Sequence, residues 1–319
     1  MIRIDHVSKR FGGRMAVEDL SIDVPRGAVY GLLGHNGAGK STTLGMLLGQ
    51  VFPDAGHVSI DGEDVFKNRK KALGCVGAIF ESPVFFDYLS GWRNLKILCD
   101  YSGPVEQARL DEVIELVGLT DRIGDKVGKY SHGMRQRLAL AQALLPGPTV
   151  LILDEPADGL DPEGIAEMRG MIARLNQEWA LTILFSSHQL NEVEAVCSHV
   201  AVMRQGKLVF NGKWPPEGES GTWISIATDR DEEARSGLLS AGLAAEATAD
   251  GRIRLSDEAR PAEITKWLVE NGFAVSEVGP VKRTLEEFYM ELSGGAVIGG
   301  GEVISSGDAE AVGIGGAAS

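Results

Sequence analysis

The segment Gly34–Thr42, GHNGAGKST, constrains the fold more than any other feature of this 319-residue chain. It fits the pattern G-x-x-x-x-G-K-[ST] and directly follows the apolar run Ala28–Leu33, which predicts a strand, while residues 41–49 predict a helix. Glycines let such a loop curl until its N–H groups face an anion at the N-terminus of the helix. An ordinary glycine turn is the alternative, but the strand–loop–helix context favours a phosphate-binding loop in an α/β fold.

The residue types in this loop predict how it would bind a nucleoside triphosphate and a metal ion. The Lys40 ammonium group would reach the β- and γ-phosphates, and the Ser41 hydroxyl would ligate Mg²⁺. The residues expected to contact the nucleotide are Gly34, Asn36, Gly37, Ala38, Gly39, Lys40, Ser41 and Thr42.

A second candidate motif is Val150–Pro156, VLILDEP, in which an apolar run ends at two adjacent carboxylates. Successive side chains of a strand point to opposite sides, so the two acids cannot have the same role. We expect Asp154 to bind Mg²⁺ through water and Glu155 to act as general base toward the attacking water. Two solvated acids at a strand end are the alternative, which the phosphate-binding loop in the same chain disfavours.

The remaining pattern predicts alternating strands and helices followed by a change of composition. Strands are expected at 2–7, 20–24, 57–62, 150–153, 181–185, 200–203 and 207–210, and helices at 92–101, 105–117, 133–145 and 162–179. Such alternation indicates a mainly parallel sheet covered on both faces. Residues 214–220 are a predicted linker, 221–292 a small α+β module, and the Gly-rich residues 293–319 a disordered tail.

A third motif, Tyr130–Leu138 (YSHGMRQRL), makes the pattern specific, because Gly159-Leu-Asp161 and Ser186-Ser-His188 follow it in order. This series resembles the ABC ATPases, whose signature is usually LSGGQ, over about two thirds of the chain. Position 132 departs from the usual second glycine, whereas Gly133 is kept. A signature of this kind is similar to the exporter branch that handles drugs, peptides, lipids and polysaccharides.

The resemblance implies an α/β fold in which residues 1–213 form the ATP-binding domain. That domain would contain a P-loop NTPase core with a mainly parallel sheet, an antiparallel β subdomain, and a helical subdomain at about 84–146. It also implies a head-to-tail homodimer or heterodimer in which the signature of one subunit completes the ATP site of the other.

Individual roles carried over from the family fall on matching positions. Ser131 and Gly133 would contact the γ-phosphate across the dimer, and Asp161 would relay the state of one site to the other. His188 would contact the γ-phosphate and hold Glu155 and the attacking water, and Phe11 would stack on adenine. Stacking tolerates any base, so we expect loose nucleotide choice.

Glu81 lies in GAIFESPVFF, residues 77–86, between the end of a predicted strand and an aromatic loop. The family usually has glutamine here, which ligates Mg²⁺, positions water and senses the membrane partner. Glutamate at this position resembles the exporters of lantibiotics and bacitracin-like peptides. A strand-end acid turned to water is the alternative, and the aromatic run 84–89 either receives a coupling helix of the membrane subunit or packs between lobes.

Charge and hydropathy limit the partners. With 45 acidic and 31 basic residues the net charge is −14, the wrong sign for wrapping nucleic acid. No apolar run is long enough to span a bilayer, so membrane contact would be indirect, through a separately encoded permease at the cytoplasmic face. A soluble ABC ATPase serving translation, repair or regulation, and a nucleotide sensor without turnover, are the alternatives to a transport motor.

Overall fold

The structure is a computed structural model, and it describes residues 1–81, 83–103, 105–216, 223–248, 251–256, 259–281 and 284–294. Most of the predicted linker and of the predicted Gly-rich tail lies outside these residues. The chain forms two compact units, the first containing Met1–Trp214 and the second Pro215–Gly300.

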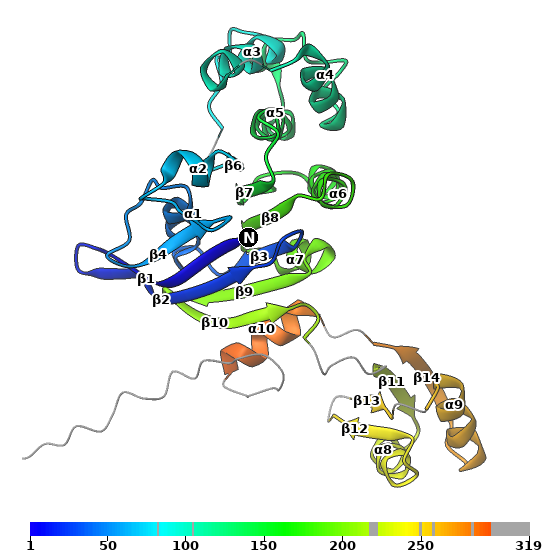
Figure 1. The fold of residues 1–319 in the computed structure, drawn as a ribbon. Helices are drawn as coiled ribbons and strands as arrows, with labels where there is room; N and C mark the ends of the chain where they lie inside the picture. The colour runs from blue at the N-terminus through cyan, green and yellow to red at the C-terminus, as the bar shows by residue number, and fades with distance from the viewer. Residues whose placement is uncertain are drawn as a thin grey trace, which may run out of the picture. The chain divides into compact units, whose positions relative to one another are not determined.

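The centre of the first unit is a six-stranded sheet in the order β10-β9-β3-β8-β7-β6 (Figure 1). The strands are β3 (Val29–Leu33), β6 (Val76–Ile79), β7 (Val150–Asp154), β8 (Thr182–Ser187), β9 (His199–Arg204) and β10 (Lys207–Lys213). All neighbours are parallel except β9 and β10. Every residue of β3, β7 and β8 is buried, as expected for parallel strands covered on both faces. The predicted α/β class is confirmed.

A second, antiparallel sheet has the order β2-β1-β4-β5, formed by β1 (Ile2–Phe11), β2 (Arg14–Val24), β4 (Ala55–Ile60) and β5 (Glu63–Asp64). The predicted strands 2–7 and 20–24 were too short, because the hairpin extends to Phe11 and Arg14. Register shifts between β1 and β2 interrupt the alternation that the prediction followed, and His6 and Asp19 both have positive φ there. The longer hairpin carries Phe11 to the end of β1.

Helices complete the first unit, and α3, α4 and α5 lie together beyond the sheets in Figure 1. The bounds are α1 (Lys40–Leu47), α2 (Arg69–Leu73), α3 (Gly91–Ser102), α4 (Gln107–Leu116), α5 (His132–Leu144), α6 (Pro162–Trp179) and α7 (Leu190–Val196), with a 3₁₀ turn at Val127–Lys129. Helices α2 and α7 were not predicted, since five and seven residues are too few for a clear helical period. One core of buried residues joins β1, α1 and β7 through Ile4, Leu44 and Ile152.

The second unit is a four-stranded antiparallel sheet in the order β12-β13-β11-β14. Its elements are β11 (Trp223–Thr228), α8 (Asp231–Ser240), β12 (Ala244–Ala247), β13 (Arg252–Leu255), α9 (Pro261–Glu270), β14 (Val275–Pro280) and α10 (Leu285–Gly294). The β-α-β-β-α-β succession with this strand order is ferredoxin-like. Ile226, Leu238 and Leu268 belong to its own core of buried side chains from the sheet, α8 and α9.

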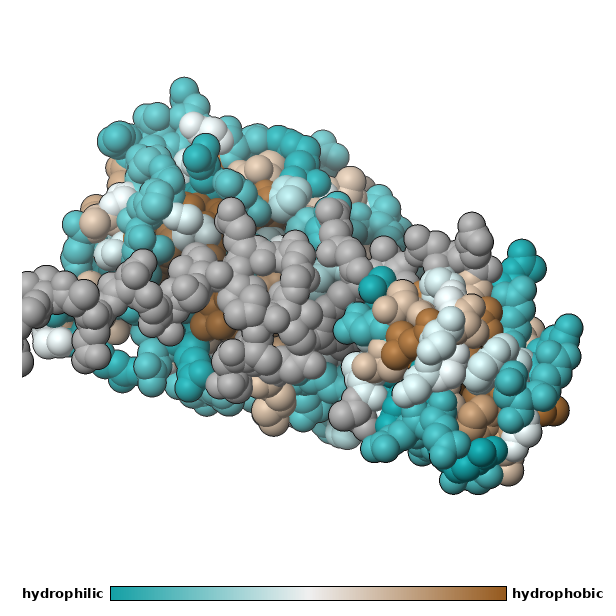
Figure 2. All heavy atoms as spheres, turned by 90° about the horizontal axis from the view of Figure 1, so that it is seen from below, coloured by the Kyte–Doolittle hydropathy of each residue, from teal (hydrophilic) through white to brown (hydrophobic). Residues whose placement is uncertain are grey.

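The described surface seen in Figure 2 is mostly polar. Figure 2 shows hydrophilic residues over much of the described surface, with hydrophobic residues in small groups among them. Within the described ranges, no helix combines the length and the apolar character that crossing a bilayer requires.

Candidate nucleotide-binding and catalytic site

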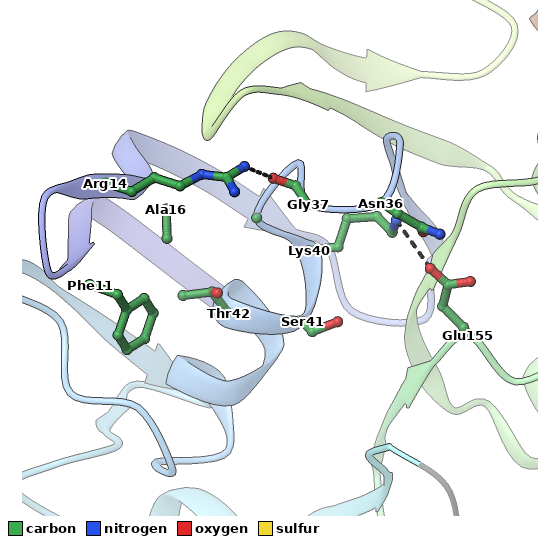
Figure 3. A pocket seen from close by; sticks show the side chains of 10 residues that line it. Phe11, Arg14, Ala16, Asn36, Gly37, Lys40, Ser41, Thr42 and Glu155 are labelled. Carbon is green, nitrogen blue, oxygen red and sulfur yellow. Dashed lines mark hydrogen bonds and ion pairs between the residues drawn. The ribbon is translucent and has the colours of Figure 1, made fainter.

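A cavity of about 530 Å³ opens where the loop after β3 meets the end of β7 (Figure 3). Most of the loop residues predicted to contact nucleotide line it, and so do Phe11 from β1 and Glu155 from the end of β7. The lining residues are Phe11, Arg14, Ala16, Asn36, Gly37, Gly39, Lys40, Ser41, Thr42 and Glu155.

The loop needs glycine at two positions for steric reasons. A Cβ on Gly39, whose φ is 109°, would lie 2.5 Å from the Ala16 carbonyl oxygen. A Cβ on Gly34 would lie 2.6 Å from the Met203 carbonyl oxygen. Because backbone atoms cannot move aside, these glycines allow the loop to pack against β2 and β9 and to enter α1 at Lys40. Ala38, also predicted to contact nucleotide, is buried and does not line the cavity.

Lys40 has three oxygen partners although its side chain is only 4% exposed. Its Nζ donates to the Gly34 carbonyl oxygen at 2.7 Å and lies 3.5 Å from the His35 carbonyl oxygen. The same nitrogen lies 3.1 Å from Oε1 of Glu155. A buried ammonium group needs such partners, and their arrangement holds the charge at the wall of the cavity.

Glu155 holds its carboxylate between two groups that sequence analysis had assigned to the same site. Oε1 faces Lys40, and Oε2 lies 2.5 Å from Nδ1 of His188, the residue directly after β8. The backbone of Glu155 has φ 45°, a conformation uncommon for a non-glycine residue. This local turn directs the carboxylate away from Asp154 and toward the cavity.

Asp154 belongs to a separate, buried network centred on Ser186. The Ser186 hydroxyl donates to Oδ1 of Asp154 at 2.5 Å and accepts a hydrogen bond from the Glu155 backbone N–H at 2.9 Å. Ser186 is fully buried and pairs with Asp154 in the β7–β8 register. One hydroxyl thus holds the side chain of Asp154 and the backbone of Glu155. The sequence signal for Ser186 was only its place in the Ser186-Ser-His188 segment.

Arg14 is a cavity residue that sequence analysis missed. Its Nη2 donates to the Gly37 carbonyl oxygen at 3.2 Å, and in Figure 3 the side chain extends over the cavity toward the loop. Phe11, on the facing strand of the same hairpin, is 52% exposed, and Lys9 Nζ lies 5.4 Å from its ring centre. A half-exposed aromatic ring and a guanidinium group therefore both line the cavity. The sequence feature that could have identified Arg14 was its position three residues after Phe11, the predicted base-stacking residue.

Ser131, Gly133 and Asp161 do not line this cavity, and they lie near one another instead. The Ser131 hydroxyl accepts from the Met134 backbone N–H at 3.2 Å as the N-cap of α5. Asp161 caps α6 by accepting from the Gly164 N–H at 2.9 Å. A Cβ on Gly133 would lie 3.7 Å from the Leu160 side chain, so the two helix starts are in contact.

Glu81 is exposed and does not line the cavity either. It lies two residues after β6, with φ 60°. Because β6 and β7 are parallel neighbours, their C-terminal ends lie on the same side of the sheet. Glu81 and Asp154 therefore lie on that side as well.

One further acidic residue joins the catalytic group. In the described part of the chain, the carboxylates of Glu155 and Asp158 and a ring nitrogen of His188 lie within 4.8 Å of one another, close enough to hold a cation together. Sequence analysis did not single out Asp158. Its position three residues after Glu155, in the turn that leads to α6, brings it there.

A phosphate-binding loop at a helix N-terminus, a buried lysine and two acids at the end of β7, which lies two strands from β3 in the same sheet, define a P-loop nucleoside triphosphatase. The family model described as ABC transporter matches residues 17–158. The ABC transporter ATP-binding protein YhcH of Bacillus subtilis (strain 168) is 40% identical over 92% of this chain and 96% of its own length. The bacitracin transport ATP-binding protein BcrA of Bacillus licheniformis is 38% identical over 94% and 99%.

A solved structure agrees with these relatives. That of cbiO1 from Clostridium perfringens, part of the ABC transporter complex cbiONQ, has a TM-score of 0.61 and 27% identity, covering 66% of this chain and 88% of its own. The chain belongs to the ATP-binding proteins of ABC transporters. It binds ATP and is an ATPase, and its hydrolysis of ATP powers transport. Because the relatives are ATP-binding subunits of transporters, the predicted transport function is confirmed over the non-transport alternatives.

Proposed function

We propose that two copies of the chain, or this chain and a related one, bind ATP head to tail and hydrolyse it to drive export through a separately encoded permease. The observation that carries this proposal is the Glu155 carboxylate, held between Lys40 and His188 at the cavity wall. Phosphoryl transfer to water needs a lysine at the phosphates, a base and an orienting group, and these three residues supply that set.

In the proposed reaction, Lys40 and the N–H groups that begin α1 bind the β- and γ-phosphates. Glu155 accepts the proton of the attacking water, and His188 holds the Glu155 carboxylate in place through its ring nitrogen. Phe11 stacks on the base, and Arg14, anchored on Gly37, faces the sugar-phosphate part of the nucleotide. The loop residues Gly34, Asn36, Gly37, Ala38, Gly39, Ser41 and Thr42 complete the cradle.

The second copy supplies the groups that this cavity lacks. Ser131 and Gly133 lie at the start of α5, where free N–H groups and the helix dipole favour an anion. They lie outside the cavity of their own chain, which supports a role at the γ-phosphate of another subunit. Asp161, which begins the neighbouring helix α6, would relay the state of one site to the other.

Mg²⁺ fits the oxygen donors at this edge of the sheet. Ser41 lines the cavity, and Asp154 has one carboxylate oxygen held by Ser186, which orients the other. Mg²⁺ is usually bound by one or two carboxylates together with substrate phosphates, so Ser41, Asp154 and Glu81 form a suitable set. Bound there, it would neutralise charge that develops on the phosphates.

An exposed apolar segment at Val84–Tyr88 supports a membrane-subunit partner and thus a place at the cytoplasmic face of the membrane. Val84 is 92% exposed, Tyr88 69% and Phe86 50%. Apolar side chains left in water in one short segment mark an interaction site. By analogy with the bacitracin transport relative, the exported molecules would be peptide antibiotics.

The test is to isolate the tagged full-length chain from detergent-solubilised membranes of its own source. We expect an integral membrane protein to co-purify and the ATPase activity of the complex to rise with bacitracin-like peptide. The matched control replaces Val84, Phe86 and Tyr88 by Ser, which should abolish co-purification without changing ATP binding. Recovery of only soluble partners, or equal recovery with the triple variant, would overturn the proposal.

A further inference from the structure

The signature motif of this chain has a side chain where a second glycine is usual, and that side chain makes a specific contact. His132, the first residue of α5, lies with Nε2 3.0 Å from the carbonyl oxygen of Asp158. The carbonyl accepts, so Nε2 must carry the proton.

The turn that His132 contacts is the one that begins at Glu155. The backbone N–H of Asp158 donates to the Glu155 carbonyl oxygen at 3.1 Å, which closes the turn. Gly159 follows with φ 70°, and a Cβ there would lie 3.4 Å from Nε2 of His132. The glycine thus meets both the backbone angle and the close approach of the imidazole ring.

A second contact connects α5 with α6 farther along the chain. Arg137 of α5 forms an ion pair with Glu167 of α6, with Nη1 and Oε2 3.5 Å apart. This ion pair does not involve His132, so removing the imidazole does not remove it. Removing the imidazole should free the catalytic turn while leaving the helix packing in place.

We propose that His132 is a positioning residue that links the signature end of α5 to the turn carrying the catalytic base of the same subunit. This inference rests on the proposed head-to-tail dimer, in which the signature contacts the nucleotide of the partner copy. Closure around that nucleotide moves the α5 N-terminus, and the bond from His132 to Asp158 passes the displacement to Glu155. The two ATP sites then hydrolyse ATP in a coupled manner.

The test compares four full-length proteins: wild type, His132→Ala, His132→Gln and the control His57→Ala. Alanine keeps the helix and removes the donor, whereas glutamine places an amide N–H at similar reach. His57 is an exposed histidine of β4 outside the site, so its replacement measures the general effect of losing a surface ring.

For His132→Ala we expect kcat to fall about tenfold, with KM for ATP changed less than about twofold and the Hill coefficient lowered toward 1. His132→Gln should recover kcat to within about threefold, and His57→Ala should match wild type. Unchanged kcat and Hill coefficient in His132→Ala would overturn the inference. The inference would also be overturned if His132→Gln did not recover kcat and thermal unfolding showed that the His132 variants are destabilised.

A second measurement separates this inference from the proposed function. In the Glu155→Gln background, ATP-dependent dimerisation should occur to the same extent with and without the additional change His132→Ala, because the contact acts on the catalytic turn. If neither protein dimerises, the proposed dimer fails. If only the protein that keeps His132 dimerises, the residue serves assembly and the positioning role is wrong.

Discussion

Replacing Ser186 by alanine should disturb both acids of the site at once, although Ser186 lies outside the cavity. Its hydroxyl is the partner of Asp154 Oδ1 at 2.5 Å and of the Glu155 N–H at 2.9 Å, and the residue is fully buried. Alanine fits the same space but leaves a carboxylate oxygen and a backbone N–H without that partner.

The size of the effect follows from the burial of the two groups. Leaving a buried polar group without its hydrogen-bond partner costs about 1–3 kcal/mol, and more when the group is charged. Asp154 is 8% exposed, so water compensates only in part. We expect Ser186→Ala to lower the free energy of unfolding by about 2–4 kcal/mol. If Asp154 ligates Mg²⁺, loss of its outer hydrogen bond should also lower kcat about 10- to 100-fold.

Guanidinium unfolding followed by circular dichroism gives the stability, and phosphate release gives kcat. Ser59→Ala is the matched control, because Ser59 is a half-buried strand serine outside the site, and its change should stay within about 0.5 kcal/mol. Wild-type stability together with wild-type kcat in Ser186→Ala would refute this account of the Asp154–Ser186–Glu155 network.

Three further predictions concern other parts of the chain. Phe11→Ala should weaken ATP and GTP binding equally, by about 1–3 kcal/mol in calorimetry, whereas an unchanged Kd would remove Phe11 from the base site. Glu81→Gln should keep ATPase activity within about threefold of wild type, because an oxygen ligand remains, whereas Glu81→Ala should lower it about tenfold at limiting Mg²⁺. Equal rates in wild type and both variants would contradict a role of Glu81 in the site. The Arg252 guanidinium, whose Nη1 lies 2.8 Å from Oε2 of Glu287, lowers the pKa of Glu287 to about 2 from 4.5. A lowered pKa stabilises the fold above the unfolded value and loses that effect as the pH falls from about 4.5 to 2. Because a third of the Glu287 side chain is exposed, solvent screening reduces the effect to about 1 kcal/mol. Glu287→Gln should therefore lower the unfolding temperature of the second unit at pH 7 and much less at pH 2, and an equal change at both would contradict the ion pair.

Sequence reasoning could predict those parts of the site that are encoded locally. The phosphate-binding loop and the Asp154–Glu155 pair each lie in one short segment, and strand alternation was enough to give the two acids different environments. The order of the motifs then identified the family. Fold class follows from the same pattern, because buried apolar strands alternate with helices.

Contacts between distant segments could not be predicted. Ser186 and Asp154 are 32 positions apart, and His132 and Asp158 are 26 apart, so each pair depends on the register of strands or the packing of helix ends. Arg14 was missed because register shifts hid the true length of the β1–β2 hairpin. Those shifts carry positive φ at His6 and Asp19, which a pattern of alternating residues does not reveal.

The most direct test of the central claim is sedimentation velocity of Glu155→Gln with and without Mg·ATP, combined with a phosphate-release assay. The account predicts a monomer without nucleotide, a dimer with Mg·ATP and no phosphate release, since Lys40 still binds the phosphates while the base is lost. Adding Lys40→Ala should return the protein to a monomer. Phosphate release at the wild-type rate, or a monomer at saturating Mg·ATP, would contradict the account.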